Sequence, residues 1–240
     1  MASSRRARFV ALSSLLARRG VDDPANAIAS GRVLVDGRVI GNPAANVRSD
    51  ATVRIMVERR LRGDIKLSHA LDHFVVPVAG RVAVDLGASA GGFTAALLAR
   101  GARRVYAVDV AIGQLVGRLR CDDRVVNLEG HNLGSMRADT IPEAVDVVTL
   151  DLGYLALAQA FPQAESLHIQ SDAHLVALVK PTFELRRARL TLSDKDIDLA
   201  VSIATRALQT YGWTPLESCP APTLGRGGAR EVFLHAHRQS

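Results

Sequence analysis

The chain has 240 residues, of which 48% are hydrophobic, and a net charge of +6 at pH 7. This length suits one large domain and a small one, and no run is apolar for long enough to span a membrane. The two cysteines lack the spacing of a metal site, and the first residues lack the continuous apolar stretch of a signal peptide. We therefore expect a cytoplasmic protein without a structural metal.

The positive charge is concentrated in the first quarter of the chain. Residues 1–62 contain twelve arginines, no lysine and five acidic residues, whereas the remainder is close to neutral. A basic segment joined to a neutral domain predicts binding to a polyanion, most often RNA or DNA. The arginines that we expect to contact it are Arg5, Arg6, Arg8, Arg18, Arg19 and Arg62.

Residues 1–57 predict a small α+β domain. The Asp23-Pro24 pair is suited to begin a helix over residues 25–29. A hairpin over 32–40 and a strand over 52–57 should follow. A preceding helix is predicted by four apolar residues on one face, namely Phe9, Leu12, Leu15 and Leu16.

After a charged linker, predicted at 58–64, strands and helices alternate through residues 65–240. That alternation predicts an α/β domain, in which helices cover both faces of a mostly parallel sheet. The predicted strands lie near 81–86, 105–109, 124–128, 146–151, 174–180, 214–219 and 231–236.

A glycine-rich loop follows the first strand of this domain. A strand, a tight turn of small residues and a helix from Thr94 form a geometry that lets the backbone approach a nucleotide closely. The glycines do not match the dinucleotide-binding G-x-G-x-x-G pattern. The sequence Asp-x-Gly-x-x-x-Gly-Gly instead resembles the first motif of S-adenosylmethionine (SAM) methyltransferases. This resemblance implies cofactor binding by Asp85, Gly87, Ala88, Ser89, Gly91, Gly92 and Phe93.

A second acid, Asp109, ends the next predicted strand. An acid in this position holds the ribose of a nucleotide through its two hydroxyls. Taken alone, Asp109 is also suited to be a helix N-cap. Together with the glycine-rich loop it predicts a cofactor site, for SAM rather than NAD, to which Val110 and Asp151 also contribute.

The chain has 27 arginines but only three lysines. Arginine keeps its proton in a protein, whereas lysine can release one, so a lysine at a sheet edge is a candidate for proton transfer. Lys180 and Asp151 each end a predicted strand, at the carboxyl edge where ligands bind in such folds. If the last strand is antiparallel, Glu231 at its start reaches the same edge.

Several motifs resemble the TlyA family, whose members join an S4-like RNA-binding domain to an FtsJ-like methyltransferase domain and are often labelled hemolysins. Besides the glycine-rich loop, the match includes Arg62-Gly63-x-x-Lys66, Lys180-Pro181-x-Phe183-Glu184 and Gly227-Gly228-x-x-Glu231. The S4-like resemblance rests on Ile28, Gly31, Val33, Val35 and Gly37.

The family resemblance implies a Rossmann-like, seven-stranded methyltransferase fold with an antiparallel last strand, preceded by the S4-like domain. It also implies SAM as cofactor and methylation of the ribose 2′-hydroxyl of a cytidine in ribosomal RNA or ribosomal subunits. The catalytic tetrad of the family falls on Lys66, Asp151, Lys180 and Glu231.

Three segments depart from the family pattern where substrate should bind, namely Leu152-Gly153-Tyr154, residues 185–192 and Ala229-Arg230. They leave open an RNA- or ribosome-binding protein with a degenerate methyltransferase site. The basic first block disfavours a small-molecule methyltransferase, and the lack of a membrane-spanning segment disfavours a pore-forming hemolysin.

Overall fold

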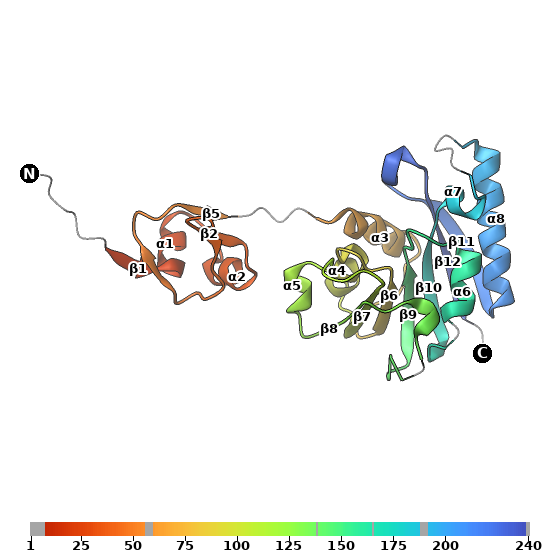
Figure 1. The fold of residues 1–240 in the computed structure, drawn as a ribbon, viewed down its shortest axis with the longest axis horizontal. Helices are drawn as coiled ribbons and strands as arrows, with labels where there is room; N and C mark the ends of the chain where they lie inside the picture. Colours follow the sequence, from red (N-terminus) through yellow and green to blue (C-terminus); the bar gives the residue numbers. More distant parts are fainter. Residues whose placement is uncertain (1–7, 56–59, 138, 165, 188–191, 239–240) are drawn as a thin grey trace, which may run out of the picture. The chain divides into compact units, whose positions relative to one another are not determined.

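The computed structural model describes residues 8–55, 60–137, 139–164, 166–187 and 192–238 (Figure 1). The chain divides into two compact units, Met1–Arg59 and Arg60–Ser240, which we call the N-terminal unit and the catalytic unit. Among the described residues, no helix is both long and apolar enough to cross a membrane.

The N-terminal unit packs two short helices against short strands around its own apolar core. Asp23 caps the second helix as predicted, because its side chain accepts the N–H of Asn26. The predicted position of Phe9 is wrong: it lies in a strand paired with Arg48 and is 62% exposed. The elements are β1 (Phe9–Ala11), α1 (Leu12–Arg18), α2 (Pro24–Ala29), β2 (Val33–Val35), β3 (Arg38–Val39), β4 (Asn46–Arg48) and β5 (Val53–Ile55).

The catalytic unit is built on a seven-stranded sheet with the order β11-β12-β10-β9-β6-β7-β8. Strands β6 to β10 pair in parallel, whereas β12 runs antiparallel to both β10 and β11. The predicted α/β fold with an antiparallel last strand is thus confirmed. The strands are β6 (Val82–Leu86), β7 (Arg104–Asp109), β8 (Val125–Glu129), β9 (Val145–Leu150), β10 (Ile169–Val179), β11 (Trp213–Pro220) and β12 (Val232–Arg238).

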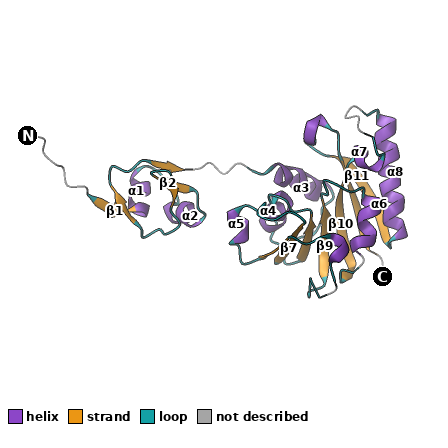
Figure 2. Ribbon diagram, in the orientation of Figure 1, coloured by secondary structure: helices purple, strands orange, loops and turns teal. Residues whose placement is uncertain are grey.

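Helices cover both faces of this sheet (Figure 2). Apolar residues of α3, α4 and α5 share one core with one face, and those of α6 and α8 share a second core with the other. The central strands are therefore buried on both sides, which explains their nearly continuous apolar sequences. The helices are α3 (Arg62–His73), α4 (Gly92–Ala99), α5 (Gly117–Arg120), α6 (Leu157–Ala164), α7 (Pro181–Glu184) and α8 (Asp194–Thr210), with short turns η1 (Leu133–Ser135) and η2 (Arg226–Gly228).

The start of the catalytic unit differs from the predicted linker. Helix α3 already begins at Arg62, and Asp64 within it accepts hydrogen bonds from the Arg60 guanidinium. This local ion pair supports a helical first turn, so the end of the predicted linker belongs to the folded unit. Lys66 consequently lies inside α3, in its second turn.

Candidate active site

The glycine-rich loop between β6 and α4 approaches the end of β9 very closely. A Cβ atom on Gly87, whose φ is +92°, would lie 2.5 Å from the carbonyl oxygen of Asp151. The N–H groups of Gly87 and Ala88 both donate to the carbonyl of Val108, at 2.9 and 3.0 Å. Only glycine fits this close approach, and the loop is held between β7 and β9.

Two further glycines let the loop pack against neighbouring helices. A Cβ on Gly91 would lie 2.2 Å from a methyl group of Leu119, and one on Gly92 would lie 2.7 Å from the Cα of Gly63. Helices α3 and α4 can therefore touch backbone to backbone. This contact brings the first turn of α3 to the edge of the loop.

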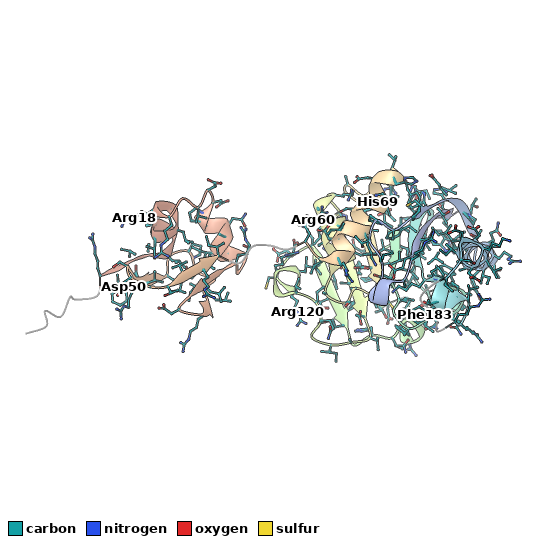
Figure 3. All side chains as sticks on the ribbon, turned by 90° about the horizontal axis from the view of Figure 1, so that it is seen from above. Arg18, Asp50, Arg60, His69, Arg120 and Phe183 are labelled. Carbon is teal, nitrogen blue, oxygen red and sulfur yellow. The ribbon has the colours of Figure 1, made fainter. Side chains whose placement is uncertain are left out.

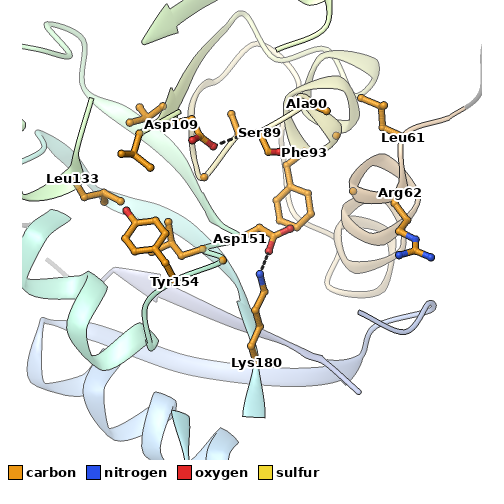
Figure 4. Close-up of a pocket in the computed structure, with 18 of the residues that line it drawn as sticks. Leu61, Arg62, Ser89, Ala90, Phe93, Asp109, Leu133, Asp151, Tyr154 and Lys180 are labelled. Atoms are coloured by element: carbon orange, nitrogen blue, oxygen red, sulfur yellow. Dashed lines mark hydrogen bonds and ion pairs between the residues drawn. The ribbon is translucent and has the colours of Figure 1, made fainter. Parts of the chain in front are cut away.

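A cavity of about 620 Å³ lies at the carboxyl edge of the sheet, and we call it the first cavity (Figure 4). Its volume falls within the range of about 300–1,000 Å³ that is usual for ligand pockets. The structure brings most of the predicted cofactor residues to it. Those that line it are Gly87, Ala88, Ser89, Gly92, Phe93, Asp109, Val110 and Asp151.

Asp85, a predicted cofactor residue, does not line the first cavity. Its side chain is fully buried beneath the loop, where it accepts hydrogen bonds from the hydroxyls of Thr94, at 2.7 Å, and Thr149, at 3.1 Å. Burial raises the pKa of Asp85 to about 7. Its position indicates that it supports the loop from below rather than contacting the cofactor. Gly91 has a similar supporting role, because it packs on Leu119.

Asp109 holds the same loop from the cavity side. Its two carboxylate oxygens accept the N–H groups of Ser89 and Ala111, each at 2.8 Å. The next helix begins only at Gly117, so Asp109 is not a helix N-cap. A carboxylate has about four acceptor positions, and those still free can accept two ribose hydroxyls.

Sequence reasoning missed Glu129, which ends β8 directly beside Asp109 in the sheet. Its Oε1 accepts the N–H groups of Gln114 and Leu115, at 2.6 and 2.8 Å. Hydrogen bonds, first from the Asn127 side chain and then from these backbone groups, lower the pKa of Glu129 to about 2. Glu129 thereby fixes the segment that follows Asp109 and Val110. An acid at a strand end was the only available sequence signal.

The four residues of the predicted tetrad form two ion pairs. Lys180 Nζ lies 2.6 Å from Asp151 Oδ1, and both side chains are partly exposed at the first cavity (Figure 4). Lys66 from α3 pairs with Glu231, which directly precedes β12, and both of these side chains are almost fully buried. Strand order therefore places Asp151, Lys180 and Glu231 at one edge, and helix α3 supplies the fourth residue.

Gly225 is a second position that sequence reasoning missed. A Cβ there would lie 2.2 Å from Oε1 of Glu231. Because Glu231 is buried and bonded to Lys66, it has little room to yield. The turn before β12 therefore needs glycine so that the carboxylate can face Lys66.

The predicted RNA-binding arginines are placed as follows. Arg18 is exposed on the N-terminal unit (Figure 3). Arg8 and Arg19 are exposed on the same unit, and the Arg19 guanidinium also donates to the backbone carbonyl of Ala51 at 3.3 Å. Arg62, the first residue of α3, lines the first cavity. Outside the described residues lie Arg5 and Arg6.

Comparisons with known proteins agree with this architecture. A sequence model of the family described as FtsJ-like methyltransferase matches residues 59–237. The 16S/23S rRNA (cytidine-2'-O)-methyltransferase TlyA of Mycobacterium tuberculosis (strain ATCC 25618 / H37Rv) is 35% identical, over 98% of this chain and 92% of that protein. Hemolysin A of Brachyspira hyodysenteriae is 28% identical, over 87% of this chain and 90% of its own length.

Among solved structures, a hemolysin-named protein from Streptococcus thermophilus is similar with a TM-score of 0.71 and 25% identity. That similarity covers 98% of this chain and 90% of the other. The family match thus spans nearly the whole described catalytic unit, and the similarity to TlyA spans nearly the full chain. With the glycine-rich loop and the two ion pairs in place, the chain belongs to the FtsJ-like methyltransferase family and, within it, to the TlyA proteins.

Proposed function

We propose that this protein transfers a methyl group from SAM to the ribose 2′-hydroxyl of a cytidine in ribosomal RNA. The observation that carries the proposal is the Lys180–Asp151 pair, which lies beside a cofactor loop at the carboxyl edge of the sheet. The 35% identical TlyA relative is named for this reaction. Because its proposed substrate is ribosomal RNA, we infer that this protein is located in the cytoplasm.

The residues of the first cavity fit SAM. Asp109 offers free acceptor positions for the ribose hydroxyls, and the glycine-rich loop supplies a surface of backbone and mostly small side chains for the amino acid end. Val110 is 52% exposed at the same cavity and offers an apolar contact for the adenine. When bound there, SAM supplies an electrophilic methyl group on a positively charged sulfur.

The protein must then position and deprotonate a weak nucleophile. Lys180 acts as the base in its neutral form, after its ammonium group has released one proton to solvent. Its Nζ then accepts the proton of the 2′-hydroxyl, and Asp151, 2.6 Å away, stabilises the ammonium group that forms again. The buried Lys66–Glu231 pair holds α3 and the start of β12 together, beside the place where the RNA ribose must enter. Holding the hydroxyl in line with the methyl group contributes much of the rate, because alignment alone is worth several orders of magnitude.

The N-terminal unit is proposed to be an S4-like domain that docks ribosomal RNA or a ribosomal subunit. Support comes from the excess of arginine in this part of the chain and from the exposure of Arg8, Arg18 and Arg19. Phosphate contacts of this kind provide affinity that depends on salt but carries little sequence information. Selection of the target nucleotide is therefore assigned to the catalytic unit.

The proposal is tested with methyl-labelled SAM and unmodified ribosomal subunits, free ribosomal RNA and an RNA-free control. Lys180→Ala should abolish label transfer and leave SAM affinity, measured by calorimetry, nearly unchanged. The matched control is Lys195→Ala, which removes an exposed lysine of α8. Asp109→Ala should weaken SAM binding.

Each other outcome identifies an alternative. Transfer by Lys180→Ala at the wild-type rate would contradict the assigned role of this lysine. SAM binding without transfer to any RNA would contradict the proposed substrate. RNA binding without SAM binding would favour the ribosome-binding protein with an idle site.

A further inference from the structure

A second cavity, of about 460 Å³, lies next to the first. The two cavities share Lys180 and Gly153, and the rest of the second cavity has different walls. Its other lining residues are Thr182, Phe183, Gly227, Ala229, Arg230 and Glu231. Lys180 therefore stands where the two cavities meet.

Methyl transfer requires two reactants to meet in line, with their reacting atoms about 3–3.5 Å apart. If SAM occupies the first cavity, the hydroxyl that Lys180 deprotonates has to arrive from a different direction. The second cavity also reaches Lys180, from the side of α7 and η2. We propose that it holds the acceptor nucleotide, with Phe183 stacking on a base and Arg230 binding a backbone phosphate. This inference rests on the proposed function and assigns its RNA-binding residues.

Phe183 is presented to the second cavity by a well-anchored turn. The short helix α7 begins directly after Lys180, and its Pro181 and Glu184 are buried while Phe183 is 37% exposed (Figure 3). Glu184 also accepts the N–H of Leu157 at 2.7 Å, which ties the turn to α6. An exposed aromatic ring on a fixed support is a suitable platform for an unstacked RNA base.

Arg230 lies at the same cavity and forms an exposed ion pair with Asp194. Its guanidinium lies 2.6 Å from Asp194 at the start of α8, and the two side chains are 56% and 83% exposed. Exposed ion pairs of this kind contribute little to stability. A phosphate, which matches the guanidinium fork with two hydrogen bonds, can therefore replace Asp194.

The acids at and beside the second cavity are paired with lysines, so they do not oppose an anion. Glu231, which lines this cavity, is paired with Lys66, and Asp151, which lines the first cavity, is paired with Lys180. Opening the Arg230–Asp194 pair would leave the guanidinium free to face the incoming strand. The cavity thus combines an aromatic surface with an available cation, which is the combination that single-stranded RNA requires.

The test uses the full chain with unmodified ribosomal RNA as the probe. Arg230→Gln should raise KM about tenfold, lower kcat little, and reduce the slope of log affinity against log salt by about one. Phe183→Leu should raise KM about tenfold without changing that slope. Asp194→Asn should act in the opposite direction and lower KM about threefold, because it removes the competitor of the phosphate.

The matched control is Arg103→Gln. Arg103 is 53% exposed and lies 2.7 Å from Glu143, so it resembles Arg230, but it precedes β7 at the amino edge of the sheet. It should leave KM and the salt slope unchanged. SAM affinity should stay at the wild-type value in every variant, which also verifies folding.

RNA affinity is measured by filter binding as well as by turnover, so the inference does not depend on transfer being observed. If wild type transfers no methyl group to RNA but the variants still change RNA affinity as expected, the proposed reaction fails and this RNA site stands. If wild type transfers normally, and Arg230→Gln and Phe183→Leu both stay within about twofold of it in KM and affinity, the assignment of the second cavity is overturned.

Discussion

Glu231→Gln removes one charge of the buried ion pair and nearly keeps the shape of the side chain. The side chains of Lys66 and Glu231 are only 7% and 6% exposed, so the remaining ammonium group would stay largely out of water. Removing one partner of a buried pair costs about 3–5 kcal/mol. Because a folded domain is typically stable by about 5–15 kcal/mol, the catalytic unit should lose a large share of its stability.

Urea unfolding, followed by tryptophan fluorescence, measures this loss. Trp213 is the single tryptophan of the chain and is 5% exposed in β11, so its emission reports on the catalytic unit. With a denaturant dependence of about 2 kcal/mol per molar urea, the unfolding midpoint should fall by about 1.5–2.5 M. A shift of this size in the urea midpoint is easily distinguished from no shift.

Two variants serve as controls. Arg103→Gln breaks an exposed ion pair with Glu143 and should cost less than about 1 kcal/mol. Replacing Lys66 by Met and Glu231 by Leu together should restore a midpoint close to wild type, because apolar residues of similar volume can replace a buried pair. A Glu231→Gln midpoint within about 0.3 M of wild type would refute the reasoning.

Two other predictions concern the supports of the site. Gly225→Ala should push Glu231 away from Lys66, since the new Cβ would lie 2.2 Å from the carboxylate, and transfer should fall about 100-fold with SAM affinity unchanged by calorimetry. Gly117→Ala, which has open space at its Cβ, is the control, and a Gly225→Ala enzyme of normal activity would contradict the role of this turn. The second prediction follows from the pKa of Asp85, which burial raises to about 7. The folded state keeps this carboxyl neutral while the unfolded chain ionises it above about pH 4, so between pH 4 and 7 wild type should lose roughly 4 kcal/mol of stability relative to Asp85→Asn. Asp85→Asn should lack this loss. The free energy of unfolding is measured by urea titration at several pH values, and parallel pH dependences for the two proteins would contradict the raised pKa of Asp85.

The sheet could be predicted from the sequence because its signals are local. Each predicted strand of the catalytic unit is present, with bounds that differ most at β10, which begins at Ile169. Strands that are buried on both faces read as short apolar runs, and the acids and lysine that end them mark the carboxyl edge. The same logic predicts the positions of Asp151, Lys180 and Glu231 at one edge.

The supporting residues could not be predicted, because their partners lie far away in the sequence. Asp85 resembles a cofactor ligand in its motif, yet its carboxylate is bonded to Thr149 from another strand. Gly225 is required because a side chain there would collide with the carboxylate of Glu231. The orientation of Glu231 in turn depends on Lys66, which lies far away in the sequence. Phe9 fits a helical pattern locally, but pairing with Arg48 makes it part of a strand. Tertiary contacts decided each of these cases.

The Lys66–Glu231 pair joins residues that are 165 positions apart, in the first helix and just before the last strand of the catalytic unit. A nascent chain therefore cannot assemble the tetrad until almost all of the unit has left the ribosome. Long-range contacts of this kind form late in folding, because the connecting chain must first be ordered. Under the proposed role of the tetrad, methyl transfer therefore requires a chain that has been synthesised at least as far as Glu231.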